Sequence, residues 1–467
     1  MDENNAIDKR MTLFALTWPI LIESFLRILF VNVDTFMLSK YSDTAAASVG
    51  AAGQYVSITI LFFQVIASGT SIVISQNLGA KNNRKAVDIA LVSLVVNLLL
   101  GILMSVFLLS FSGKLLGIMN FENEVYKYAS DYLFIVGMFS FVTDMNCTTT
   151  AILRSYGFVK VSVFVNIGAN LINVVGNLIA INGFMGIPVL GVKGVAASTV
   201  ISQCVALVLI FSALLRSIGP DMKLKRIFSF PRKIFVEVLG DIIKIGGPST
   251  GENLSYNISQ IVITAIINLM GTYALTARFY VFSIMFFIML SAVSIGQATQ
   301  IMVGYLIGAG KVDDAYKACL RSLRISVIIS FITAIVFALL GRKLIGLFTD
   351  NEQILSMGSV MLAIAIVLEP GRAFNIILGG SLKGAGDARF ILFLGIGSMW
   401  GVAVLMSYIL GIYFGLGLIG VWIAFASDEW VRGILMLLRW RSRVWESKSI
   451  VSVKPNLSAK EECVINS

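Results

Sequence analysis

A block of six apolar segments occurs twice in this sequence, over about residues 18–216 and again over about residues 247–443. Three pairs of short motifs keep the same spacing of 229 positions between the two copies. The pairs are Pro19–Glu23 with Pro248–Glu252, "LGAKNNRKA" from Leu78 with "IGAGKVDDA" from Ile307, and "LRSYGFVK" from Leu153 with "LKGAGDAR" from Leu382. Because the same motifs recur in the same order and at the same spacing, the sequence predicts two structurally similar halves.

The repeated segments are apolar enough to lie in a lipid bilayer. Of the 467 residues, 57% are hydrophobic and 13% charged, with a mean hydropathy of +0.88, which excludes an ordinary soluble protein. Stretches of about 20 apolar residues, enough to cross a hydrocarbon core of about 30 Å, can be drawn twelve times. These spans are residues 12–38, 47–74, 87–110, 125–152, 161–183, 192–215, 241–269, 274–302, 322–341, 357–381, 390–412 and 418–438. We predict an all-α integral membrane protein with twelve transmembrane helices.

The distribution of Lys and Arg predicts the orientation in the membrane. With both termini in the cytoplasm, the cytoplasmic loops hold about two thirds of the 36 Lys and Arg, as the positive-inside rule requires. The net charge of +10 is then explained by anionic lipid at the inner leaflet, without nucleic acid. The first ten residues contain no pattern of a cleaved signal peptide. We therefore predict a multi-pass protein of the cell (inner or plasma) membrane.

The two halves define the predicted domains. Because each half has six spans, an even number, both enter the membrane in the same direction, and the halves are parallel bundles with a substrate path between them. The predicted segments are an N-terminal cytoplasmic segment (1–11), an N-lobe (12–215), a basic cytoplasmic linker (216–240), a C-lobe (241–438) and a cytoplasmic tail (439–467).

Ionisable residues inside the first span are the main clue to function. A charge at the bilayer centre costs at least about 2.5 kcal/mol, so each needs a partner or a water-filled cavity. Glu23, Arg27 and Asp34 lie on one face of the expected helix. Arg27 could neutralise Glu23 one turn away as a packing device. Asp34 is two turns from Arg27, and it is therefore a candidate carrier of a proton or cation.

Two further spans of the first half carry polar side chains. Asn166, Asn170, Asn173 and Asn177 lie on one helical face, either as interhelical hydrogen-bond donors or as a polar wall that orients a carboxylate. Asp144 in the fourth span is either a hydrogen-bonded structural acid or part of a substrate cavity.

The second half has different polar residues. Its first span lacks an acid at the position of Asp34, but it contains two polar faces that must line water or contact another polar helix. These faces are Glu252, Tyr256 and Ser259, and Asn253, Asn257 and Gln260. Span ten contains a Glu369–Arg372 pair beside a helix break at Pro370.

Span twelve contains Asp428, Glu429 and Arg432, close to its predicted cytoplasmic end. We expect these charges to snorkel or to pair with one another. Comparison of the two halves shows that the loop motifs are copied more faithfully than the charged helix faces. Because Asp34 and the asparagine strip belong to the first half alone, we expect ion coupling there.

The sequence argues against enzymatic chemistry. It contains no histidine, which excludes the HExxH zinc motif and the Ser/His/Asp triad, and it has no Walker loop for ATP. Aromatic and Met residues of span eight could line a site for cationic ligands, although lipid contact or packing also explains them. These residues are Phe279, Phe282, Met285, Phe286 and Met289.

Five motifs in order resemble the multidrug and toxic compound extrusion (MATE) family. They are "VDTFMLS", "SQNLGAKNNRKA", "LRSYGFVK", "GVKGVAAST" and "LKGAGDAR", and the likeness covers about residues 12–440. The resemblance implies two six-helix bundles in a V-shaped arrangement that exchange inward-moving Na⁺ or H⁺ for outgoing organic cations. It implies no cofactor other than the coupling ion.

The resemblance also suggests roles for single residues. Asp34 stands at the position of the coupling acid in helix one, Asn173 matches an Asn of helix five and Thr199 a Thr of helix six. These matches predict ion coupling at Asp34, Asn173, Asn177 and Thr199. Asn177 stands where many relatives carry an Asp, a departure that leaves the choice between H⁺ and Na⁺ open. Tyr256 replaces an acid of helix seven with Glu252 one turn earlier, and Arg372 replaces an acid of helix ten with Glu369 a turn away.

The leading hypothesis is a monomeric secondary antiporter that exports cationic amphipathic small molecules. Asn170, Asp144, Glu23, Arg27 and the polar residues of the second half would line or support the cavity. The alternative is a flippase of a lipid-linked anionic precursor, in which Arg27 and Arg372 would bind phosphate. A membrane enzyme would need an acidic or His cluster at one membrane face, and the sequence has none.

Overall fold

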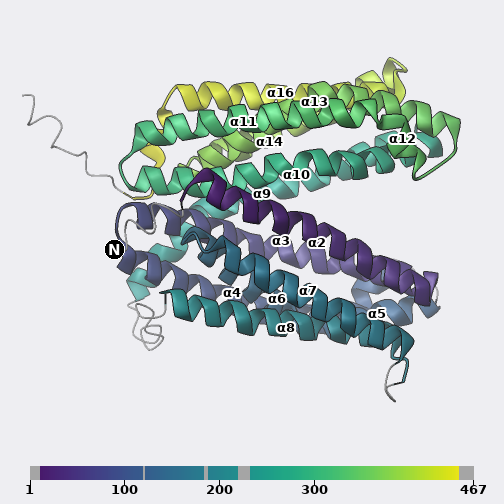
Figure 1. Ribbon diagram of the computed structural model, residues 1–467, viewed down its shortest axis with the longest axis horizontal. Coiled ribbons are helices and arrows are strands. Elements are labelled where there is room, and N and C mark those ends of the chain that lie inside the picture. Colours follow the sequence, from purple (N-terminus) through teal and green to yellow (C-terminus); the bar gives the residue numbers. More distant parts are fainter. Residues whose placement is uncertain (1–10, 119–120, 122, 184–187, 219–231, 452–467) are drawn as a thin grey trace, which may run out of the picture. The chain divides into compact units, whose positions relative to one another are not determined.

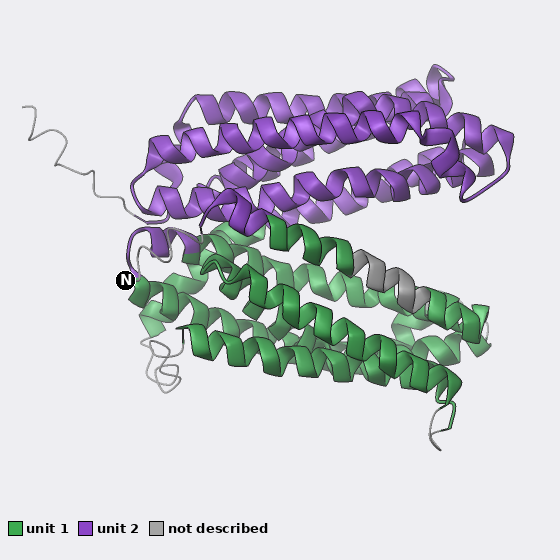
Figure 2. Ribbon diagram, viewed as in Figure 1, with its two compact units in different colours: residues 1–10, 18–74, 83–247 green, residues 11–17, 75–82, 248–467 purple. Residues whose placement is uncertain are grey.

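The structure, a computed structural model, describes residues 11–118, 121, 123–183, 188–218 and 232–451, without the side chains of residues 27–35 and 118. Within these residues every regular element is helical, and each of the twelve predicted spans falls on helix. The described chain divides into two compact units (Figure 2). Unit 1 comprises Trp18–Ile74 and Asn83–Gly247, and unit 2 comprises Met11–Thr17, Ser75–Asn82 and the chain from Pro248.

Unit 1 contains most of the helices of the first half of the chain (Figure 1). The fourth predicted span is two helices, α5 and α6, which meet at Phe139. Helix α4 packs against both of them, and α8 packs against α5, α6 and α7. The helices are α2 (Leu13–Tyr41), α3 (Asp43–Gly79), α4 (Asn83–Ile118), α5 (Asn123–Met138), α6 (Ser140–Ser155), α7 (Val159–Asn182) and α8 (Gly191–Ile218).

In unit 2, helix α13 contacts α10, α11 and α16 and is the central element. The eleventh predicted span alternates between α-helix and π-helix. Helix α9 (Arg232–Asn268) begins in unit 1 and continues in unit 2 from Pro248. The other helices are α10 (Thr272–Gly308), α11 (Val312–Leu339), α12 (Gly341–Gly346), α13 (Glu352–Gly384), α14 (Ala388–Ser398), η2 (Met399–Val404), α15 (Leu405–Tyr408), η3 (Ile409–Tyr413), α16 (Gly417–Arg441) and η4 (Val444–Lys448).

Eight helices of the described residues are long and apolar enough to cross a membrane by length and composition, among them α3, α4, α10 and α13. The α5–α6 span is divided into two shorter helices, and α9 and α16 carry more polar and charged residues.

Glycines bring helix backbones into direct contact within each unit. In unit 1 a side chain on Gly69 would overlap the carbonyl of Ile242, so α3 touches the first turns of α9. In unit 2 side chains on Gly79 and Gly308 would overlap the carbonyls of Tyr305 and Gln76. The end of α3 and the end of α10 can approach this closely only because both positions lack a Cβ atom.

The duplicated loops have the same backbone geometry. Lys81 and Gly310, 229 positions apart, both have a left-handed backbone, with φ of 57° and 75°. In the loops before α7 and α14, Gly157 and Gly386 also have positive φ, 79° and 98°. The similarity of the loop motifs therefore reflects a shared mode of ending a helix, in which a left-handed residue follows the last turn.

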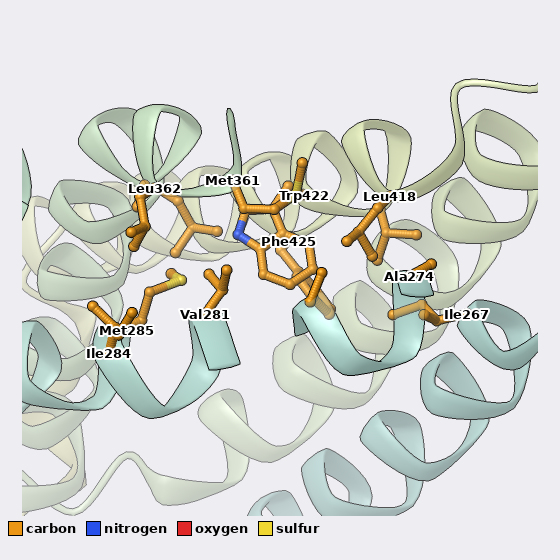
Figure 3. Packing of buried hydrophobic residues seen from close by; sticks show 14 of the residues in the cluster. Ile267, Ala274, Val281, Ile284, Met285, Met361, Leu362, Leu418, Trp422 and Phe425 are labelled. Atoms are coloured by element: carbon orange, nitrogen blue, oxygen red, sulfur yellow. The ribbon is translucent and has the colours of Figure 1, made fainter. Parts of the chain in front are cut away.

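A hydrophobic cluster of unit 2 packs α10, α13 and α16 together. Figure 3 shows Val281 and Met285 of α10 beside Trp422 and Phe425 of α16 and Leu362 of α13, all of which are buried. Phe282 packs against the same cluster and meets Trp422 in a T-shaped arrangement, with the ring planes at 82°. Met285 and Phe282 therefore belong to the packed core, which favours the packing interpretation of these two side chains.

One predicted helix break is wrong. Helix α13 continues without interruption from Glu352 to Gly384 with Pro370 inside it. Proline removes one backbone hydrogen bond, but transmembrane helices tolerate this where neighbouring helices pack closely. Gly371 permits such packing, because its backbone lies against the indole of Trp430. The V-shaped arrangement and the predicted lobe boundaries stay predictions.

Candidate functional site

The predicted asparagine strip is present on one face of α7 in unit 1. The Asn166 amide donates to Glu23 Oε1 at 2.8 Å, and the Asn170 amide donates to the Asn166 carbonyl at 2.7 Å. Further along the helix, Asn177 donates to Asn173 Oδ1 at 3.4 Å. The strip becomes more enclosed along its length, since Asn166 and Asn170 are half-buried while Asn173 and Asn177 are buried.

Asn173 also connects the strip to α8. Its amide donates to Thr199 Oγ1 at 3.2 Å, and its backbone carbonyl accepts a hydrogen bond from Ser198 at 2.9 Å. Gly176 provides the space for this approach, because a Cβ atom there would overlap the Ser198 hydroxyl. The structure thus brings together three of the four residues for which we predicted ion coupling, Asn173, Asn177 and Thr199.

The fourth residue, Asp34, lies outside the described side chains, as does Arg27. Their backbones belong to α2, the helix that also carries Glu23. Asp34 therefore stays a prediction from the sequence, and so does a pairing of Arg27 with Glu23.

Glu23 has a basic partner that the sequence analysis did not consider. Its Oε1 lies 2.6 Å from a guanidinium nitrogen of Arg154 on α6. Ser162 donates to the other carboxylate oxygen at 3.4 Å. With Asn166 as a third donor, the Glu23 carboxylate connects α2, α6 and α7, and its hydrogen bond with Arg154 is charge-assisted.

Asp144 on α6 differs from Glu23. Its side chain is fully buried, and neither carboxylate oxygen accepts a hydrogen bond among the described residues. The interpretation of Asp144 as a hydrogen-bonded structural acid is therefore wrong for the described part of the chain. Gly101 of α4 provides its space, since a Cβ atom there would lie 3.0 Å from Asp144 Oδ2.

In unit 2, Glu252 pairs with Lys383 of α13 at 2.5 Å. This pair repeats the first half, because Glu252 and Lys383 each lie 229 positions after Glu23 and Arg154. The expectation that the charged helix faces were not copied is therefore wrong for this ion pair. At the position of Asn166 the second half has Gly395, and a Cβ atom there would lie 3.2 Å from Glu252 Cγ.

The other polar residues of α9 have separate environments. Asn253 and Asn257 are exposed, and the Asn257 amide donates to the Asn253 carbonyl at 2.8 Å. Gln260 accepts a hydrogen bond at 3.0 Å from Arg278, which is buried on α10. Tyr256 is half-buried on the same helix.

Five charged side chains form a buried cluster on α13 and α16, and we call them the C-lobe charge cluster. Arg372 pairs with Glu369 at 2.6 Å and with Glu429 at 3.3 Å. Arg432 pairs with Asp428 at 2.6 Å and with Glu429 at 3.4 Å. Each is at most 8% exposed. Glu429 therefore joins the two arginines in one network.

Neutral polar side chains complete this cluster. Asn375 donates to Glu429 Oε2 at 2.7 Å, and Ser398 donates to Asp428 Oδ1 at 2.6 Å. Asp428 lies eleven residues from the start of α16, near its middle, rather than in its last turns. The expectation that the charges of span twelve snorkel is wrong, whereas the expectation that they pair is confirmed.

Comparison with known proteins identifies the family. The sequence profile of the MatE family matches residues 19–179 and 248–409, one block in each half of the chain. The chain belongs to the MATE family. The matched blocks begin at Pro19 and Pro248, the first residues of the repeated proline–glutamate motif.

Two relatives and a solved structure extend this match. The chain is 42% identical over 443 residues to a Bacillus subtilis (strain 168) protein named uncharacterized transporter YisQ, covering 95% of this chain and 96% of the relative. It is 23% identical over 444 residues to the probable multidrug resistance protein NorM of Thermotoga maritima, covering 95% and 94%. A crystal structure of a MATE protein in the bent conformation matches with a TM-score of 0.86 at 22% identity, covering 97% and 100%.

MATE membership confirms several predictions. The chain is a multi-pass membrane transporter with the all-helical twelve-helix MATE fold, and it is not an enzyme.

Sequence analysis missed Arg154, Lys383 and Asn375 as members of the polar sites. A signal for the first two was present, since both are basic and lie at equivalent positions of the repeated motif "LRSYGFVK" and "LKGAGDAR".

Proposed function

We propose that this MATE chain is a monomeric secondary active antiporter. It exports cationic amphipathic small molecules in exchange for inward-moving H⁺ or Na⁺, and access alternates between its two six-helix lobes. Relatives named as multidrug resistance proteins support a small-molecule substrate. No cofactor other than the coupling ion is required, and both termini lie in the cytoplasm.

The observation that carries the proposal is the buried amide strip of α7. Asn173 and Asn177 are at most 6% exposed, and Asn173 contacts Thr199 of the neighbouring helix. Buried amides in a membrane protein are costly unless they serve a polar partner. Asp34 of α2 would be a further partner of this strip, in addition to Thr199 and Ser198. Loading Asp34 with a cation from outside would favour the state that releases substrate by differential binding.

The charged residues of the second half differ from the strip of the first half, and this difference supports ion coupling in the first half. In its C-lobe charge cluster, Arg372 and Arg432 lie against all three carboxylates. These arginines act as built-in counterions, so the carboxylates need no mobile cation for neutralisation. We therefore assign ion coupling to the first half.

Transport in proteoliposomes tests the proposal. Ethidium, a fluorescent organic cation, would be loaded into vesicles and a Na⁺ gradient or a pH gradient would be imposed. Wild-type protein is expected to move ethidium with one of the two gradients, and Asp34→Asn is expected to lose this gradient dependence. Asp350→Asn, at an exposed loop residue, is the matched control. Intact gradient-driven transport in Asp34→Asn would contradict the mechanism.

The flippase alternative receives less support from the geometry. Arg372 is buried and forms ion pairs with Glu369 and Glu429, so it is not available to a phosphate without breaking both pairs. Arg27 lies outside the described side chains. Translocation of a lipid-linked precursor, measured beside ethidium efflux in the same vesicles, separates the two functions.

A further inference from the structure

Asp144 is a buried carboxylate that the proposed coupling site does not use. It lies on α6, which packs against α4, α7 and α8. Its exposed fraction is 0%, and neither Oδ1 nor Oδ2 has a hydrogen-bond partner among the described residues. Oδ2 points toward α4, where Gly101 leaves the space that a side chain would fill.

A second unsatisfied oxygen lies on the adjoining turn of the same interface. Asn97 precedes Gly101 by one turn of α4, and its amide nitrogen donates to the hydroxyl of Thr148 on α6. Thr148 in turn follows Asp144 by one turn and donates to its backbone carbonyl at 3.1 Å. The side-chain oxygen of Asn97 is buried and has no hydrogen-bond partner in the described part of the protein.

No described basic side chain compensates the Asp144 carboxylate. Among the described residues, no Lys or Arg side chain donates to either of its carboxylate oxygens. This distinguishes it from Glu23 and Glu252, which pair with Arg154 and Lys383. An ionised carboxylate that is buried without a counterion costs several kcal/mol, so the anion requires a mobile cation.

We propose that Asp144 and Asn97 form a monovalent-cation site on the α4–α6 interface, which takes H⁺ or Na⁺. The carboxylate supplies the charge, and the Asn97 oxygen supplies a further ligand of the oxygen type that hard cations prefer. The site deepens the proposed function, because it adds a second ion-binding carboxylate to Asp34. Its occupancy is measurable without transport, so the site and the antiport mechanism can fail separately.

The test measures cation binding in purified protein reconstituted in lipid. In an Asp34→Asn background, radioactive ²²Na⁺ binding and the carboxylic-acid C=O band in the infrared are followed over pH. The expected result is one remaining site, seen either as Na⁺ bound or as a titrating acid band. Adding Asp144→Asn is expected to abolish that signal. Binding and titration that are unchanged by Asp144→Asn, or absent already in Asp34→Asn, would overturn the proposal.

Two further variants keep the test decisive if Asp144→Asn does not fold. Asp144→Glu retains the acid and should shift the titrating infrared band, whereas an unshifted band would assign the signal to another residue. Asn97→Leu removes the amide oxygen, and it should weaken Na⁺ binding at least about tenfold if Na⁺ is the ligand. If the ligand is H⁺, Asn97→Leu should change the titration of the acid band instead. Asp350→Asn is the control and should leave both signals unchanged.

Discussion

Glu252 and Lys383 form an ion pair at 2.5 Å, at positions equivalent to those of Glu23 and Arg154, which pair at 2.6 Å. In each half the acid lies one turn after the proline of the first span, and the base lies in the last turn of the fourth span. The duplication has therefore preserved a charged contact between the first and the fourth span of each half.

Breaking either of these pairs should destabilise the protein. In a double-mutant cycle with Glu252→Gln and Lys383→Met, we expect a coupling energy of about 1–3 kcal/mol, because both side chains are at most 18% exposed. Glu23→Gln with Arg154→Met should behave similarly. Thermal unfolding followed by size-exclusion chromatography measures the effect.

The control for this prediction is the Lys85–Glu237 pair at 3.1 Å, with side chains 34% and 57% exposed. Its coupling should be about 0–1 kcal/mol. Equal coupling energies in the enclosed and exposed pairs would contradict the structural importance of the duplicated contact.

Glu429→Gln should be among the most destabilising single substitutions in the C-lobe charge cluster. It removes the anion between Arg372 and Arg432 while both cations stay buried, which costs about 3–5 kcal/mol in such networks. Glu352→Gln is a matched control, since its pair with Arg342 is mostly exposed. Chemical denaturation in lipid or detergent would compare the two, and a similarly small loss in both would show that the buried network is not strongly coupled.

The sequence predicts the helices and much of the first half's polar face. Hydropathy locates the spans because bilayer thickness imposes their length, and the helical period places Asn166, Asn173 and Asn177 on one face. The periodicity of one helix contains no information about its neighbour. For this reason the sequence suggested Arg27 as the partner of Glu23, whereas the described partner, Arg154, comes from another helix.

The environment of Asp144 was also beyond sequence reasoning. Whether a carboxylate accepts hydrogen bonds depends on which turn of a neighbouring helix faces it, and here that turn contains Gly101. Similarly, the predicted start of span twelve, residue 418, is only one residue from the start of α16 at Gly417. What the sequence does not reveal is that Glu429, near the middle of this helix, contacts Arg372 of α13.

Lys81→Gly should stabilise the loop between α3 and α4. Lys81 has a left-handed backbone with φ of 57°, which costs a residue with a side chain about 1–2 kcal/mol. The equivalent position in the second half is already Gly310. After the greater entropy loss of glycine on folding is included, we expect a gain of about 0.5–1 kcal/mol in unfolding free energy. Gly310→Lys is the reciprocal variant and should lose about 1–2 kcal/mol, and a loss in both variants would contradict the argument.

Trp445→Ala should loosen the segment that follows α16. Trp445 is fully buried, its ring is stacked on Trp440 at 4.1 Å, and its Nε1 donates to the Trp440 carbonyl at 2.8 Å. Truncating a buried tryptophan costs about 3–5 kcal/mol. The same segment places the Ile450 amide 3.0 Å from Gln76 Oε1, at the end of α3. We therefore expect faster hydrogen exchange at Ile450 in Trp445→Ala. Trp18→Ala, at a residue that is 54% exposed, should leave this exchange unchanged. If exchange at Ile450 is the same in Trp445→Ala and wild type, the stacked tryptophans do not hold this segment.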